Sequence, residues 1–385
     1  MNSRERVLLS LSHKEPDRVP LDIGATPVTG IAKKAYDRLT RHIGLSTDEP
    51  PFFDVIQQLA SPSEEFLQRF RVDVRNVRPN PGSHWSLRIE EDGDRFRFTD
   101  EWGLRWGMPK VGGHYFDMTG NPLGGTGTTA ETVRNLPMPD PRDEARYKGM
   151  RSRAEAIRKS GHAVVVSSLC AGIFELGGWL RGYEDFYCDL ALDENLAASY
   201  LDRFLDIKLE YWKRVFDDFG DLIDVAQEAD DLGSQNAMLV SPDTYRRIMK
   251  PRHEKLFSYI HGRGKAKVFY HSCGSFRPVL GDLIEAGVDI LNPVQFNAKD
   301  MDAYSLKRDF GEDLVFWGGG VDTQVVLPGK KPAEVKDDVR RQIEILAPGG
   351  GFIFNTVHNI QGDVPPENLV AMFEALEEHG IYPVA

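Results

Sequence analysis

The chain has 385 residues, of which 41% are hydrophobic and 28% are charged. This composition is ordinary for a folded globular protein and excludes disorder as the dominant state. The net charge of −12 repels polyanions and therefore argues against binding to nucleic acid or to an anionic membrane surface. No apolar run reaches the roughly 18 residues that a membrane-spanning helix requires, which excludes an integral membrane protein.

Cysteine is scarce, with Cys170, Cys188 and Cys273 as the three thiols. The odd number and the irregular spacing argue against the disulfide framework of a small secreted protein. The N-terminus has charged residues but no apolar stretch behind them, so it lacks the pattern of a signal peptide. We therefore expect a cytoplasmic location.

The first part of the chain predicts short elements of both kinds. A helix is expected near residues 3–11, followed by a short strand over Val19–Ile23. Residues 30–45 and 52–70 have helical patterns, and a further short strand is expected over Val72–Val77.

Residues 84–117 predict an antiparallel meander. Leu87–Glu90 and Arg95–Phe98 alternate between apolar and polar residues, and Asp92-Gly93 between them is typical of a hairpin turn. The following residues, up to 143, are rich in glycine, proline and threonine and predict an ordered loop. We therefore interpret residues 84–143 as an insertion into a single domain that spans residues 1–385.

From about residue 145 onward, apolar strands alternate with longer amphipathic helices. The expected strands are Ala163–Ser167, Leu222–Ala226, Ala266–His271, Val288–Pro293, Leu314–Trp317 and Phe352–Val357. With the two strands expected earlier in the chain, the number is roughly eight, which favours a closed (β/α)8 (TIM) barrel. An open, doubly wound α/β sheet is the alternative, but no glycine-rich dinucleotide motif follows an early strand.

In such a barrel the active site lies at the carboxyl ends of the strands, where this chain has many polar residues. His271 and Cys273 follow one strand, and alternation places both side chains on the same face. Imidazole and thiolate are ligands that suit Zn²⁺, and His358 at another strand end offers a third ligand. The simpler interpretation of the pair is a buried cysteine beside a hydrogen-bonded histidine.

An acidic group follows the strand that precedes this pair in the chain. Glu228, Asp230 and Asp231 are candidates for a fourth metal ligand or for a general acid. Capping of a helix by Asp231 is the structural alternative.

Several motifs together resemble the uroporphyrinogen decarboxylase superfamily over nearly the whole chain. They are Arg4–Val7 with Pro16–Pro20, Phe269–Gly274, Gly287–Asn292, Trp317–Asp322 and Gly349–Phe352. The resemblance implies a (β/α)8 barrel and one of two activities. One branch is the cofactor-free decarboxylase of haem biosynthesis, and the other contains zinc-dependent methyltransferases that work with a corrinoid protein and a thiol or tetrahydrofolate.

Two departures from the family patterns bear on this choice. The decarboxylase branch has an arginine-rich segment that holds the carboxylates of the tetrapyrrole, but residues 21–27 here contain no arginine and include Asp22. The methyltransferase branch holds zinc with His-x-Cys and a later cysteine. Here His271 and Cys273 match the first part, and His358 stands near the expected place of the later cysteine.

The leading hypothesis is therefore a zinc-dependent methyltransferase that transfers a methyl group between a corrinoid partner protein or a small methylated substrate and a thiol- or folate-type acceptor. The residues expected to orient the substrate are Asn292, Gln295, Asn355 and Gln361. One alternative is a metal-free decarboxylase or other lyase, with Asp22 as a catalytic residue. Another is a non-catalytic protein that binds a tetrapyrrole or corrinoid. A homodimer is expected by analogy with the superfamily.

Overall fold

A parallel sheet of seven strands curls through the centre of the molecule. The computed structural model describes residues 1–45 and 51–384. The strand order is β13-β12-β11-β10-β9-β8-β3, and every neighbouring pair is parallel. The strands are β3 (Val74–Val77), β8 (Ala163–Ser167), β9 (Val225–Ala229), β10 (Lys267–His271), β11 (Ile290–Asn292), β12 (Val315–Trp317) and β13 (Phe352–Ile353).

The segment 19–23 joins the two edges of this sheet and completes the barrel. Leu21 forms a parallel bridge with Phe354, just beyond β13. On its other side, the backbone carbonyl of Leu21 accepts a hydrogen bond of 2.9 Å from the N–H of Asp73, just before β3. The predicted (β/α)8 barrel is therefore confirmed, with its first strand reduced to a short extended segment.

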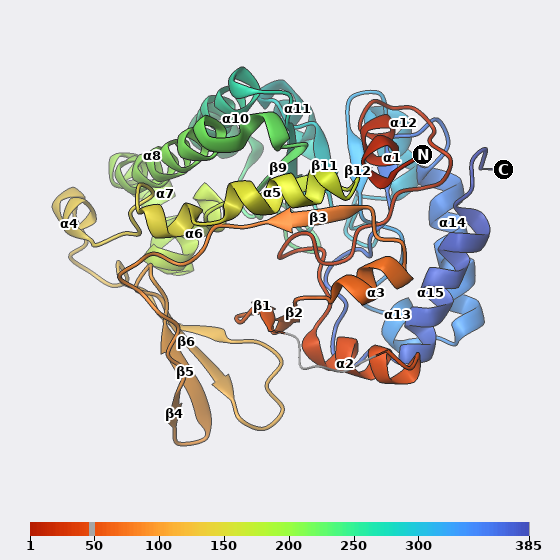
Figure 1. Cartoon of the computed structure of the whole chain (residues 1–385). Helices are drawn as coiled ribbons and strands as arrows, with labels where there is room; N and C mark the ends of the chain where they lie inside the picture. The colour runs from red at the N-terminus through yellow and green to blue at the C-terminus, as the bar shows by residue number, and fades with distance from the viewer. Residues whose placement is uncertain (46–50, 385) are drawn as a thin grey trace.

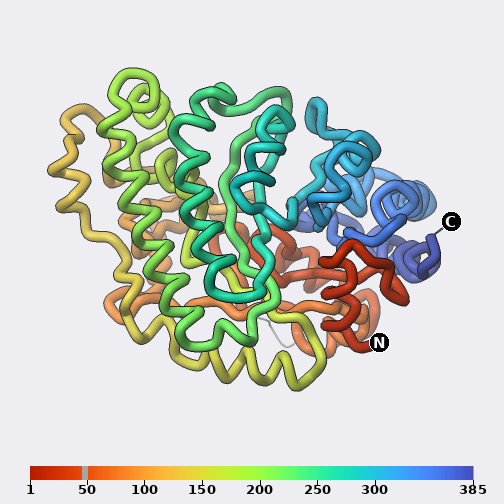
Figure 2. Tube along the Cα trace, turned by 90° about the horizontal axis from the view of Figure 1, so that it is seen from above, coloured from red at the N-terminus to blue at the C-terminus, as the bar shows by residue number. Residues whose placement is uncertain are grey.

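Helices surround the barrel, as Figure 2 shows from above. The longest is α8, whose buried aromatic and aliphatic residues recur on one face. None of the helices in the described ranges is both long enough and apolar enough to cross a membrane. The helices are α1 (Ser3–Ser10), α2 (Lys33–His42), α3 (Glu64–Arg69), α4 (Ala130–Asn135), α5 (Met150–Lys159), α6 (Ile173–Arg181), α7 (Tyr183–Leu192), α8 (Glu194–Phe219), α9 (Pro242–Thr244), α10 (Lys250–Arg263), α11 (Leu280–Ala286), α12 (Ala303–Phe310), α13 (Val326–Gly329), α14 (Pro332–Leu346) and α15 (Pro366–His379), with short single turns η1 (Glu144–Tyr147), η2 (Gly220–Leu222), η3 (Tyr245–Met249) and η4 (Arg277–Val279).

The inserted meander is present between β3 and β8. Its four antiparallel strands follow one another in the sheet as β4 (Glu90–Asp92), β5 (Arg95–Thr99), β6 (Arg105–Pro109) and β7 (Asp117–Gly120). Figure 1 shows this sheet projecting from the barrel. Gly93 has a φ of +57° in the predicted hairpin turn, a conformation that glycine adopts without a steric penalty. This part of the prediction is confirmed, and the sheet extends slightly beyond residue 117.

The helix predicted over residues 52–70 is wrong in its first half. Residues Phe52–Asp54 form β1, which pairs with β2 (Leu59–Ala60), and only α3 is helical. The Asp54 carboxylate accepts a hydrogen bond of 2.8 Å from the N–H of Gln57, which favours a turn over a helix. Ser63 then caps α3, because its hydroxyl accepts a hydrogen bond from the N–H of Phe66.

Candidate metal centre and cavity

Three potential metal ligands meet at the carboxyl end of the barrel. His271 ends β10, Cys273 follows two residues later, and His358 lies in the loop after β13. One ligand atom from each lies within 4.8 Å of the other two. The distance between Nε2 of His271 and Sγ of Cys273 is 3.5 Å. Two imidazoles and one thiol, gathered from two chain segments, form a donor set that suits zinc.

The orientation of His271 is fixed by Asn292 on the neighbouring strand β11. The side-chain N–H₂ of Asn292 donates a hydrogen bond of 2.7 Å to the carbonyl of Trp317, so its Oδ1 must face the other way. That oxygen lies 2.6 Å from Nδ1 of His271. Nδ1 is therefore the protonated ring nitrogen, and the lone pair of Nε2 faces Cys273. This is the tautomer and the outer support that a metal-binding histidine requires.

When no metal is bound, burial determines the protonation states of His271, Cys273 and His358. It lowers the pKa of His358 to about 3, with a further contribution from His271. Burial also lowers the pKa of His271, against the opposing effects of Asp231 and Asn292. Both imidazoles are therefore neutral. Burial, reinforced by the charges of Asp231 and Glu175, raises the pKa of the Cys273 thiol well above its ordinary value. A bound metal would reverse this effect, because metals select the thiolate.

Among the three acidic residues at the end of β9, Asp231 lies beside this group. Its Oδ1 is 3.7 Å from Nε2 of His271 and accepts a hydrogen bond of 2.7 Å from the N–H of Cys273. The structure does not bring the other two acidic residues to the centre. Glu228 and Asp230 alternate with Gln227, Ala229 and Asp231, and they point toward the helices outside the barrel.

Both outward carboxylates are already bound by partners. Glu228 Oε2 lies 2.6 Å from Nζ of Lys208, and Oε1 accepts a hydrogen bond of 2.6 Å from Trp212, both on α8. Asp230 lies 2.8 Å from Nε2 of His253 on α10 and accepts a hydrogen bond from the N–H of Glu175. These contacts connect the barrel wall to the helix layer, so both carboxylates have structural partners outside the cavity.

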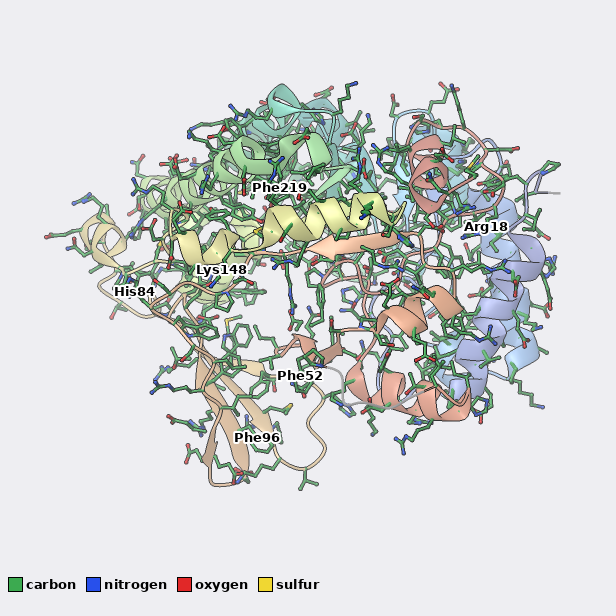
Figure 3. The ribbon with its side chains drawn as sticks, viewed as in Figure 1. Arg18, Phe52, His84, Phe96, Lys148 and Phe219 are labelled. Carbon is green, nitrogen blue, oxygen red and sulfur yellow. The ribbon has the colours of Figure 1, made fainter. Side chains whose placement is uncertain are left out.

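A cavity of about 520 Å³ opens above the candidate metal centre, within the range of small-molecule sites. Its floor is formed by the strand ends, including His271, His358 and Asp231. The meander and the β1–β2 hairpin supply the opposite wall, and Figure 3 labels Phe96 in the meander and Phe52 in the hairpin. The wall residues from these two segments are Phe53, Asp54, Ile56, Gln57, Asp100, Trp102, Leu104, Trp106 and Met118.

Asp100 holds the tryptophans of the meander in place. Its Oδ1 accepts hydrogen bonds of 2.9 and 3.0 Å from the N–H groups of Trp102 and Leu104, and its Oδ2 accepts one of 2.8 Å from the indole of Trp106. Both tryptophans are buried. The sequence predicted that they pack the meander, and in the structure they also line the cavity.

The four residues expected to orient the substrate do not line the described cavity. Asn292 supports His271, as described above. Gln295 accepts a hydrogen bond of 2.7 Å from the N–H of Gly274 and so holds the turn after Cys273. Asn355 donates to the carbonyl of Asp22, and Gln361 is hydrogen-bonded to Tyr115 in the insertion. Their observed contacts position loops around the site.

Asp22 is fully buried beside the barrel wall, outside the residues that line the cavity. Its Oδ2 accepts a hydrogen bond of 3.0 Å from the indole of Trp317, and its Oδ1 accepts one of 3.1 Å from the N–H of Ala25. Burial raises the pKa of Asp22 to about 6, although these hydrogen bonds and one from Thr29 oppose the shift.

This shift predicts a pH-dependent stability. The folded chain binds a proton at Asp22 more tightly than the unfolded chain does. The stabilisation is therefore complete below the unfolded pKa and is lost as the pH rises through about 6. The loss is about 3 kcal/mol. Urea denaturation of wild type and Asp22→Asn at about pH 4 and about pH 7.5 should show a difference in unfolding free energy that changes by this amount. A pH-independent difference would contradict the assignment.

Comparison with known proteins places this barrel in a family. Residues 119–379 match the family model described as uroporphyrinogen decarboxylase (URO-D). The cavity lies at the carboxyl ends of the barrel strands, which is where (β/α)8-barrel enzymes have their active sites. The chain belongs to the URO-D family, whose members are enzymes.

Two individual proteins are similar to the chain. A uroporphyrinogen decarboxylase from Psychromonas ingrahamii is 25% identical over 267 residues, which cover 65% of this chain and 69% of that protein. The structure of a methyltransferase from Methanosarcina mazei superposes with a TM-score of 0.62 and 18% identity, covering 98% of this chain and 99% of that one. This second likeness shows that the two chains share a fold over their whole lengths.

Proposed function

We propose that this protein is a zinc-dependent methyltransferase. The observation that carries the proposal is the group His271, Cys273 and His358, which gathers a zinc-type donor set at the floor of a cavity. The likeness to a Methanosarcina mazei methyltransferase supports it. In this proposal the methyl group moves between a corrinoid partner protein or a small methylated substrate and a thiol- or folate-type acceptor.

In this proposal the residues in and around the metal centre have separate roles. His271, Cys273 and His358 would hold the metal, with Asp231 beside them as the candidate fourth ligand. Bound zinc supplies Lewis acidity, which lowers the pKa of an acceptor thiol. Asn292 keeps the His271 ring in its metal-binding tautomer. The meander forms one wall of the cavity that would hold the reacting groups.

The structure gives less support to a decarboxylase that acts on a polyanionic tetrapyrrole. Arg78 is the one lysine or arginine among the described residues that line the cavity. Its guanidinium donates to the carbonyl of Phe53 and lies 4.5 Å from the centre of that ring. Several carboxylates of a substrate would therefore lack counter-charges. Asp22, the candidate catalytic residue of a lyase, is buried outside the cavity.

The proposal is tested with methylcobalamin as a methyl donor. Zinc-loaded protein is mixed anaerobically with methylcobalamin and either a small thiol or tetrahydrofolate, and the corrinoid absorption is followed. We expect demethylation that requires zinc and is lost in Cys273→Ser. A protein that releases CO₂ from carboxylic acids after removal of metal would support the lyase instead. A corrinoid or tetrapyrrole that stays bound without turnover would support a binding protein.

Loss of the support behind His271 should weaken metal binding. Asn292→Ala removes the acceptor for the Nδ1 proton, and we expect the affinity for zinc to fall by about 10- to 100-fold. The measurement is competition with a chromophoric chelator. Asn368→Ala is the matched control, because Asn368 is also a buried asparagine but bonds to Leu327 and Lys330. Equal affinities in the two variants would show that Asn292 does not support a metal ligand.

A further inference from the structure

Two indole rings, those of Trp106 and Trp179, lie side by side in the wall of the cavity, and we call this pair the indole corner. Trp106 comes from the meander and Trp179 from α6, and both line the cavity. Their ring centres are 5.7 Å apart and their planes are nearly perpendicular, at 84°. Met118, paired with Trp106 across the meander, lines the cavity as well. The two indoles pack edge to face, and both border the cavity. An aromatic ring face attracts an organic cation that lies within about 6 Å of the ring centre.

Two acidic side chains, Glu175 and Asp231, line the same cavity, and neither has a lysine or arginine ion-pair partner among the described residues. Glu175 lies one helical turn before Trp179 on α6, so the two side chains share a helix face. One Glu175 oxygen accepts a hydrogen bond of 3.1 Å from the N–H of Gly172. Among the described residues, no lysine or arginine forms an ion pair with Glu175 or Asp231.

The other charged groups of the cavity are already balanced. Asp100 is bound by the three N–H groups of the meander described above. Asp54 lies near Arg78, whose positive charge acts on it. If zinc occupies the centre, its two positive charges are matched by the Cys273 thiolate and by Asp231. Glu175 remains in the cavity wall next to the indole corner, without a lysine or arginine ion-pair partner among the described residues. Burial and the charges of Asp231 and Asp230 raise its pKa well above the ordinary value, and a cation bound beside it would favour the carboxylate form.

From this arrangement we propose that the cavity binds a methylated ammonium cation as the substrate that carries the methyl group. This inference rests on the proposed function. The carbon–nitrogen bond breaks with both electrons remaining on nitrogen, and the methyl group forms a bond to the sulfur of a thiolate acceptor. The cationic nitrogen becomes a neutral amine, and the thioether product is uncharged. Glu175 and the indole corner are the specificity-determining groups.

The test compares a cation with its uncharged isostere. Choline and 3,3-dimethylbutan-1-ol have the same shape but differ in the positive charge. We measure binding of each to the full-length protein by calorimetry and tryptophan fluorescence, with and without zinc. We expect choline to bind at least about tenfold more tightly than the alcohol. The advantage should fall by about 3- to 30-fold in Trp179→Leu, the range of a cation–π contact. It should also fall in Glu175→Gln, which removes the negative charge beside the cation.

The matched control is Glu184→Gln, which removes an exposed carboxylate on α7 and should leave the preference for choline unchanged. Equal binding of choline and the alcohol to wild type would overturn the inference, whatever the variants do. That result, with zinc present and methylcobalamin demethylated, would leave the proposed function standing with another substrate. Selective binding of choline by a protein that takes up no metal would support the cation site while removing the proposed function.

Discussion

Replacing Lys208 with methionine is expected to lower the free energy of unfolding by about 3–5 kcal/mol, because it leaves a buried carboxylate without its counter-charge. The side chains of Lys208 and Glu228 are 0% and 2% exposed and lie 2.6 Å apart. Burial favours the uncharged lysine, but the attraction of Glu228 outweighs it and raises the pKa of Lys208 to about 12. Urea denaturation near neutral pH measures the effect.

Two further variants separate the charge from the packing. Lys208→Met combined with Glu228→Gln removes both charges, while the amide oxygen introduced at this position can still accept from Trp212, and the double variant should recover most of the lost stability. Lys213→Met breaks an exposed ion pair with Asp217 on the same helix and should leave the stability nearly unchanged. If the double variant is as unstable as Lys208→Met, the loss comes from packing instead of an unpaired charge.

The second large effect is expected at His358. His358→Ala removes one of the three proposed metal ligands, and we expect zinc affinity to fall by more than about 100-fold, the upper range for loss of an outer-shell partner. His358→Cys restores a ligand and should bind zinc tightly, because thiolate is a strong zinc donor. Chelator competition measures the affinity, and Co²⁺ substitution reports the donors.

The Co²⁺ spectra distinguish coordination from indirect effects. We expect the thiolate-to-metal absorption of wild type to strengthen in His358→Cys, since a second sulfur then binds the metal. The same band should vanish in Cys273→Ser. If His358→Ala keeps the wild-type affinity and spectrum, His358 is not a ligand and the centre must be assigned differently.

The sequence predicted the barrel where its strands are continuous apolar runs. The strand Ala163–Ser167 is an example, since it is buried on both faces and matches β8 fully. The prediction failed where polar residues occupy a strand. β9 begins at Val225 and contains Gln227 and Glu228, whereas the apolar pattern placed the strand three residues earlier. Partners on α8 satisfy Glu228, and a linear pattern does not contain that information.

The candidate site was predictable to the extent that one strand carries it. His271 and Cys273 share a face by alternation alone, and the barrel architecture places His358 at the same end. The same alternation also separates Asp231 from Glu228 and Asp230, but the sequence does not say which side faces inward. Glu175 and Trp179 were missed, because their helical spacing is also that of an ordinary amphipathic helix.

The most direct test of the account is the metal content of the purified, zinc-reconstituted protein by elemental analysis. Wild type is compared with Cys273→Ser and with Cys188→Ser, which alters an exposed thiol outside the centre. The account predicts about one zinc per chain in wild type and in Cys188→Ser, and its loss in Cys273→Ser. A wild-type protein without metal, or a Cys273→Ser variant that retains it, would contradict the metal centre and with it the proposed methyltransferase.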